Sequence, residues 1–129
     1  IGFGSYSLQR ETDFIRKQKT IYKAIQEIEN YPFSWSVVLF GSYSKGTETK
    51  QSDVDLIVTC IPSREKEVED FVKSLKHKYG INFSPVVLPM HEFSNIKKDN
   101  PELWHDLKIY GVVFKGGDNF YYWMYKCDK

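Results

Sequence analysis

Apolar positions recur at helical spacing in two long segments of the chain. Between Leu8 and Asn30 they fall mostly on one stripe, and Pro32 follows where a helix has to end. A second stripe runs from Pro62 to Tyr79, and Gly80 stands where a C-terminal cap belongs. Charged residues cover the other side of this second segment, which is typical of a solvated helix face. The pattern predicts two amphipathic helices.

Shorter apolar runs have the length and composition of strands, namely Ser36–Phe40, Val54–Cys60, Ile81–Leu88 and Ile109–Phe114. Pro85 is disfavoured in a central ladder, so the third run is predicted to be an edge strand or to contain a bulge. A short helix is expected over His91–Lys98, and Asn100-Pro101 is a start signal for another. This order predicts an α/β or α+β fold, a small mixed sheet flanked by helices.

Composition narrows the class of protein. With 129 residues, 41% of them hydrophobic, we expect one domain over residues 1–129, in which 1–32 form the N-terminal helix, 33–116 the core and 117–129 an aromatic tail. The net charge is +1, which disfavours a DNA- or RNA-binding domain and bulk binding of nucleic acid. No apolar run is long enough to span a membrane. Cys60 and Cys127 are too few for a disulfide framework, which favours a cytoplasmic protein.

A glycine-rich segment, Gly41-Ser42-Tyr43-Ser44-Lys45-Gly46, directly follows the first predicted strand. Its two glycines have the spacing of a phosphate-binding P-loop, but Thr47-Glu48 stand where that motif needs Lys and Ser or Thr, so the P-loop interpretation fails. A Gly-Ser turn after a strand can still bind phosphate, because glycine lets the backbone approach an anion closely. The same pattern is also common in ordinary turns.

Two carboxylates follow at positions i and i+2. Asp53 and Asp55 should therefore project from one face of the second strand, while the residues between and after them suit a core. Neighbouring carboxylates repel each other unless a cation lies between them, and Mg²⁺ prefers a few carboxylates together with substrate phosphates. Alone, such a pair is usually surface decoration. A Ca²⁺ loop is excluded because Leu-Ile-Val follows the second acid, and the histidines have no partners at zinc spacing.

The two motifs together, over about nineteen consecutive residues from Phe40 to Val58, resemble the signature of the DNA polymerase β-type nucleotidyltransferase superfamily. The short chain is similar to its minimal nucleotidyltransferase group. The resemblance implies a palm-like catalytic core, a nucleoside triphosphate such as ATP as substrate, and transfer of a nucleoside monophosphate, with AMP as the candidate, to a hydroxyl acceptor.

The resemblance also implies roles for individual residues. Gly41 and Ser42 would bind the β- and γ-phosphates, and Gly46 would allow the close turn. Asp53 and Asp55 would be the catalytic residues and the Mg²⁺ ligands, for two ions or, more readily, for one. For Lys45, neutralisation of phosphate charge and simple exposure to solvent are left as equal alternatives.

One departure from the family pattern leaves an alternative function open. Active members carry a third carboxylate on the strand after the intervening helix, where this chain offers only Asn82 and Ser84, and Glu92 lies further along. The alternative is a catalytically weak or inactive nucleotide-binding module, antitoxin-like and paired with a helical HEPN-type protein. The bulky segment Phe120–Tyr125 would pack on the domain or on such a partner, or else stack on a nucleobase.

Overall fold

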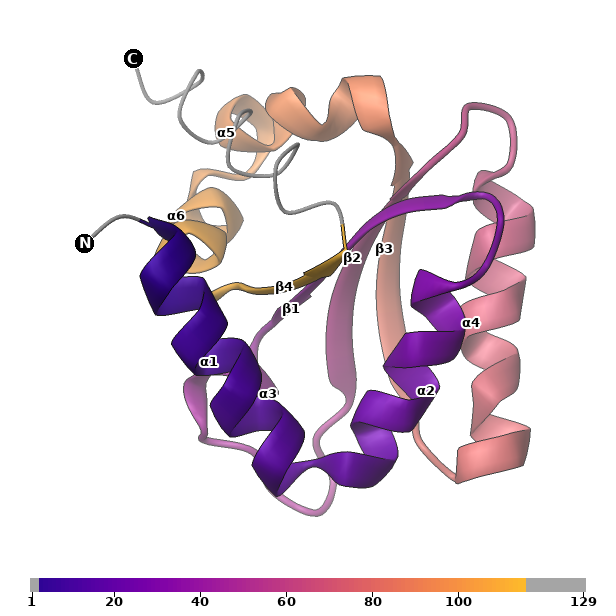
Figure 1. Ribbon diagram of the computed structural model, residues 1–129. Coiled ribbons are helices and arrows are strands. Elements are labelled where there is room, and N and C mark those ends of the chain that lie inside the picture. Colours follow the sequence, from indigo (N-terminus) through magenta and orange to yellow (C-terminus); the bar gives the residue numbers. More distant parts are fainter. Residues whose placement is uncertain (1–2, 116–129) are drawn as a thin grey trace.

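A four-stranded sheet in the order β3-β2-β1-β4 forms the centre of the fold (Figure 1). The structure, a computed structural model, describes residues 3–115. Strand β1 pairs antiparallel with β2 and with β4, whereas β2 and β3 are parallel. The strands are β1 Ser34–Phe40, β2 Val54–Cys60, β3 Phe83–Pro89 and β4 Val112–Lys115. The predicted mixed sheet with flanking helices is confirmed, and Pro85 does lie in an edge strand.

The predicted single helix over Leu8–Asn30 is wrong, because the structure has two helices there. Helix α1 spans Phe3–Lys17 and α2 spans Lys19–Glu29, and Gln18 between them has a non-helical φ of −123° and ψ of 60°. The Gln18 side chain donates to the Glu48 carboxylate at 3.3 Å, so the break is tied to a distant loop. After the change of direction, α2 buries its apolar stripe in the main core, and α1 contributes Phe14 to the same core.

The remaining helices begin and end near the predicted signals. Helix α4 spans Glu65–Tyr79, and Gly80 ends it with a φ of +69°, as expected for a glycine cap. The predicted short helix is a 3₁₀ helix, η1 Met90–Asn95, followed by α5 Ile96–Asp99. Helix α6, Pro101–Tyr110, is capped by the Asn100 side chain, which accepts from the Leu103 N–H at 3.2 Å.

The last strand starts later than predicted. Ile109 and Tyr110 belong to α6, and β4 begins at Val112. Both side chains are exposed at the end of the helix. Together with the apolar residues of β4 they make one continuous apolar run, which was predicted to be a single strand. The expectation for the sequence after residue 115, including Phe120–Tyr125 and Cys127, falls outside the described residues.

The two faces of the sheet are covered differently. Helices α1, α2 and α4 cover one face and bury Val37, Leu39, Leu56 and Val58 in the main core. On the opposite face, η1, α5 and α6 pack over Val38 and Ile57 through the following apolar side chains: Phe93, Ile96, Trp104 and Leu107. This second face carries the residues of the candidate site, because Asp55 alternates with Leu56 along β2.

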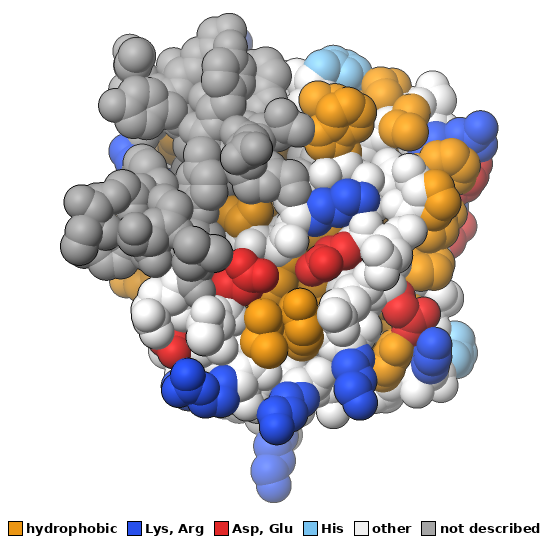
Figure 2. Space-filling model, viewed as in Figure 1, with side chains coloured by type: hydrophobic (Ala, Val, Ile, Leu, Met, Phe, Trp, Pro, Cys, Tyr) orange, Lys and Arg blue, Asp and Glu red, His pale blue; other side chains and the backbone are white. Residues whose placement is uncertain are grey.

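Charge on the helical face that Figure 2 displays is mixed. Basic side chains follow most of its lower rim, and both acidic and basic side chains lie near its centre. That distribution agrees with the net charge of +1 and gives no field of a single sign on this face. Among the described helices, none has the length and apolar character needed to cross a bilayer.

Candidate active site

A tight loop with two left-handed glycines links β1 to β2. Gly41 precedes the one-turn helix α3, Ser42–Lys45, with a φ of +77°, and Gly46 ends it with a φ of +75°. The Gly41 carbonyl accepts the Lys45 N–H at 3.1 Å and the Ser44 hydroxyl at 2.8 Å. Positive φ is easy only for glycine, so the spacing of the two glycines fixes where the chain turns.

The Asp55 carboxylate lies directly against Gly41. Asp55 pairs with Phe40 across the antiparallel β1–β2 ladder, which brings the end of β1 beside the start of β2. A Cβ added to Gly41 would overlap Asp55 Oδ2 and lie 3.0 Å from Asp55 Cγ. The missing side chain of Gly41 therefore creates the space that the carboxylate occupies. The structure thus brings together the glycine-serine turn and one of the two predicted acids, although they are fourteen positions apart in the chain.

Asp53 is exposed and directly precedes β2, two positions before Asp55. Burial, and after it the nearby Asp53 charge, raises the pKa of the Asp55 carboxyl above its usual range. The turn before the acids is closed by Ser52, whose hydroxyl accepts the Thr49 N–H at 2.8 Å. A partly buried carboxylate beside a second one is the electrostatic setting that a bound cation would relieve.

The strand next to the acids supplies no carboxylate. Asp55 is in parallel register with Ser84 of β3, and the Asn82 carbonyl accepts the Val54 N–H at 2.9 Å. Within residues 3–115, no group of three His, Cys, Asp or Glu side chains is placed to hold a metal ion. Glu92 lies in η1 and lines a separate groove beside Val86.

Lys45 has a partner that the sequence did not reveal. Its Nζ lies 3.1 Å from Asp106 Oδ2 and 5.3 Å from the centre of the Tyr110 ring, both on α6. The ion pair joins α3 to α6, and both side chains remain about one third exposed. The lysine next to the glycine-serine turn is therefore neither simply free in solvent nor buried. A contact between residues 45 and 106 leaves no local signal in the sequence.

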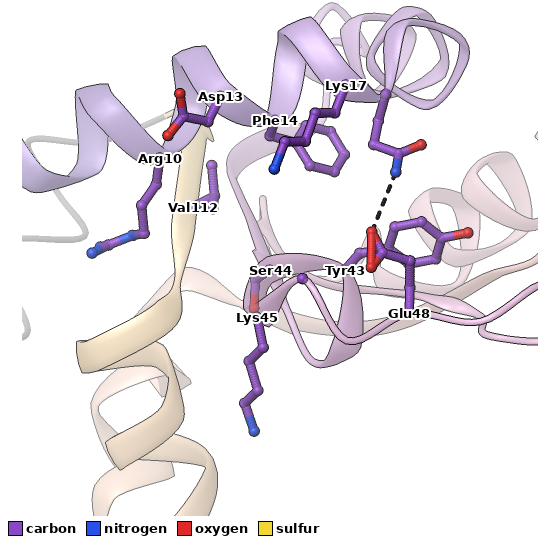
Figure 3. A pocket seen from close by; sticks show the side chains of 11 residues that line it. Arg10, Asp13, Phe14, Lys17, Tyr43, Ser44, Lys45, Glu48 and Val112 are labelled. Atoms are coloured by element: carbon purple, nitrogen blue, oxygen red, sulfur yellow. Dashed lines mark hydrogen bonds between the residues drawn. The ribbon is translucent and has the colours of Figure 1, made fainter.

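A pocket of about 260 Å³ opens on the side of α3 that faces α1 (Figure 3). Arg10, Asp13 and Lys17 of α1 lie across from Tyr43 and Lys45 of the loop. Neither Gly41 and Ser42 nor the two acids line this pocket, so it is not the predicted phosphate cradle. The Arg10 guanidinium donates to the Gly111 carbonyl at 2.9 and 3.1 Å.

Comparison with known proteins places this geometry in a family. The family model described as "Nucleotidyltransferase domain" matches residues 15–110, which include the loop and both acids. The protein MJ1305 of Methanocaldococcus jannaschii, which carries the provisional name of protein adenylyltransferase, is 37% identical over 92 residues. That match covers 67% of this chain and 61% of MJ1305, so the chain spans less than two thirds of that relative's length.

Solved structures show the same fold. A toxin–antitoxin crystal structure with AMP-PNP has a chain that aligns with a TM-score of 0.52 at 19% identity, covering 85% of this chain and 82% of that one. A chain from a mutant form of the toxin–antitoxin complex MntA–HpeT aligns with a TM-score of 0.58 at 17% identity, with the same coverage. Together with the family match, these findings establish that the chain belongs to the nucleotidyltransferase domain family of DNA polymerase β type.

Proposed function

We propose that this protein is a Mg²⁺-dependent nucleotidyltransferase that binds a nucleoside triphosphate and transfers its nucleoside monophosphate, AMP in the first instance, to a hydroxyl group. The observation that carries the proposal is the contact of the Asp55 carboxylate with Gly41. It sets one acid of the proposed pair against the proposed phosphate-binding turn, and nucleotidyl transfer needs both kinds of group close together. Family membership supports the reaction class, and the provisional name of MJ1305 supports adenylate as the group transferred.

The residues present fit a magnesium ion. Asp55 is partly buried next to another carboxylate, and its pKa is raised for that reason, so a divalent cation would stabilise the ionised pair. Asp53 and Asp55 are the proposed ligands. When bound, Mg²⁺ supplies neutralisation of triphosphate charge and polarisation of the reacting oxygens. Ser84, in register with Asp55, offers only a neutral hydroxyl at the position next to the pair.

The loop would bind and orient the triphosphate. With its left-handed backbone, Gly41 lets the main chain approach a phosphate closely, and the Ser42 hydroxyl is a further donor. Gly46 keeps the loop tight at the other end of α3. Lys45 could reach phosphate only by leaving Asp106, an exchange of one exposed ion pair for another. In the reaction the acceptor oxygen bonds to the α-phosphorus as the bond to pyrophosphate breaks, and the hydroxyl proton leaves to solvent.

A second candidate function is a nucleotide-binding, antitoxin-like module with little or no transfer activity. The absence of an acid on β3 beside Asp55 favours it, because Ser84 stands where a third carboxylate would complete the site. The structural neighbours are toxin–antitoxin complexes, one of them with AMP-PNP, which supports a helical HEPN-type protein as the partner of this chain.

Incubation with α-labelled ATP, Mg²⁺ or Mn²⁺ and a lysate of the source organism separates the two functions. Transferred label that disappears in Asp53→Ala and in Asp55→Ala supports nucleotidyl transfer. Saturable ATP binding, measured by calorimetry, with no label on any acceptor supports the second function. If the folded protein transfers no label and binds no ATP, both functions are contradicted. Asp70→Ala, an exposed acid on α4, is the matched control and should behave as the unmodified protein.

A further inference from the structure

A second concave region lies on the same face of the sheet as the acid pair. This groove, of about 280 Å³, is bounded by β3, α5 and the start of α6. Val86, Leu88 and Leu103 provide apolar lining, and Val86 is 42% exposed although it lies on a strand. An apolar side chain left open in a sheet position is a surface that a partner can cover.

The groove begins next to the candidate active site. Along β3, Ser84, Val86 and Leu88 share one face, and the parallel register sets Ser84 beside Asp55 and Val86 beside Ile57. At the usual rise of a strand, Val86 is therefore about 7 Å along the sheet from the position of Ser84. That is the distance spanned by about two residues of an extended peptide, so a polypeptide with its hydroxyl at the acids would reach the groove with its next residues.

The rim of the groove is acidic. Glu92 of η1 and Asp99 of α5 both line it and both are exposed. Within the described residues neither carboxylate takes part in an ion pair, unlike the acids along α4. Lys97 and Lys98 lie on the same short helix but do not line the groove. An apolar floor between two unpaired carboxylates is complementary to an aliphatic side chain flanked by basic residues.

We propose that this groove, lined by β3, α5 and α6, seats the acceptor of the transfer reaction, and that the acceptor is a protein segment carrying an aliphatic residue and basic residues within about four positions of the hydroxyl. The proposal rests on the proposed function and specifies its acceptor class. The groove would supply binding and register, while the loop and the acids act on the nucleotide.

Two ten-residue fluorescent peptides test the charge preference. Both contain one tyrosine with a leucine two positions away, and they differ only in having two lysines or two glutamates beside the leucine. Fluorescence anisotropy at low salt should give the lysine peptide at least about fivefold tighter binding than the glutamate peptide. In the double variant Glu92→Lys with Asp99→Lys the order of the two peptides should reverse, because the rim has changed sign.

The matched control is the double variant Glu67→Lys with Asp70→Lys on α4, which packs on the opposite face of the sheet and changes the net charge equally. This control should still bind the lysine peptide more tightly than the glutamate peptide. Loss of the preference in this control as well, equal binding of both peptides, or no binding of either up to about 1 mM would overturn the groove proposal.

Transfer of labelled AMP to the tyrosine is measured in the same samples and tests the proposed function separately. Transfer without a charge preference would contradict the groove and leave nucleotidyl transfer in place. A reversible charge preference without transfer would contradict catalysis and leave the groove as a docking site for a basic protein segment.

Discussion

The two faces of the sheet differ in how completely their side chains are buried. On the face under α1, α2 and α4, apolar side chains from every strand are buried in the main core. On the other face, the helices cover only Val38, Ile57 and their neighbours, and the rows that contain Asp55 and Val86 remain partly open. The comparison teaches that the alternation of β2 separates the main core from the candidate site, because adjacent residues of this strand point to opposite faces.

The largest expected effect is a loss of transfer activity on the face of the sheet that carries Asp55. In Asp55→Asn, nucleotidyl transfer should fall by at least about a thousandfold, because the amide removes a charged ligand from the pair. The fold should not suffer, since burial and the Asp53 charge raise the pKa of Asp55 and the ionised carboxylate is therefore a cost to stability. Label transfer and the melting temperature are the two measurements. A melting temperature that falls steeply would show that the two faces are not separate in function.

One residue further along β2, we expect a substitution to lower stability and to leave transfer activity largely unchanged. Leu56 is fully buried in the main core, so Leu56→Ala should lower the free energy of unfolding by about 3 kcal/mol. Denaturant unfolding measures this loss, and transfer per folded molecule should stay within about threefold of the unmodified protein. A specific loss of transfer in the folded fraction would contradict the division between faces.

The contact between the loop and Asp55 can be tested with two glycines that share a positive φ, +77° at Gly41 and +75° at Gly46, but differ in ψ, which is −155° at Gly41 and 20° at Gly46. Gly41→Ala places a Cβ on the Asp55 carboxylate, whereas Gly46→Ala places one in open space. Gly46→Ala carries the strain of a left-handed residue, about 1 kcal/mol, and Gly41→Ala carries more, because its backbone angles are almost exclusive to glycine. We expect ATP binding, measured by calorimetry, to weaken by about tenfold or more only in Gly41→Ala. Equal weakening in both variants would mean that the position of Asp55 is not what matters.

A smaller effect, on the pH dependence of stability, is expected on the face covered by α1, α2 and α4. Burial, and then the Glu11 charge, raises the pKa of Glu29 from 4.5 to about 7. Because the folded-state pKa lies above the unfolded value, this group's contribution is fully present below about pH 4.5 and is lost as the pH rises through about 7. Glu29→Gln should remove that loss and stabilise the protein at pH 8 by about 1–2 kcal/mol, as judged by denaturant unfolding.

Glu27 on the same helix is the control for this pH effect. Its pKa is lowered, first by the hydrogen bond from Tyr79 and then by the one from Lys78. Its contribution is therefore present above pH 4.5 and lost as the pH falls through the lowered folded-state pKa. Glu27→Gln should weaken the protein at pH 8, opposite in sign to Glu29→Gln. A stability change at pH 8 of the same sign in both variants would contradict the opposite pKa shifts of Glu27 and Glu29.

Features that a few neighbouring residues determine could be predicted from the sequence. The bounds of β2, the glycine cap of α4 and the Asn100 cap of α6 follow from local apolar pattern and cap chemistry, and all are found where expected. The family resemblance predicted that the glycine-serine turn and the acids act together, and in the structure Asp55 lies against Gly41.

Features that depend on partners far away in the chain could not be predicted. At the break between α1 and α2, Gln18 donates to Glu48, 30 positions along the chain, and Lys45 pairs with Asp106, 61 positions along. The groove beside β3 forms only when α5 and α6 return over the open face. Each of these depends on how the helices are placed on the sheet, which apolar periodicity within one segment does not encode.

The order β3-β2-β1-β4 also has a consequence for how the molecule assembles. Val38 lies between Ile57, which is close in sequence, and Val113, which is far away. Closing the longer loop costs more chain entropy, so β4 should join a sheet that β1, β2 and β3 have already begun. The Lys115 ammonium donates to the Glu29 carbonyl at 2.6 Å and the Ser34 carbonyl at 2.9 Å. One cation at the end of a four-residue strand thereby ties β4 to the end of α2 and the start of β1.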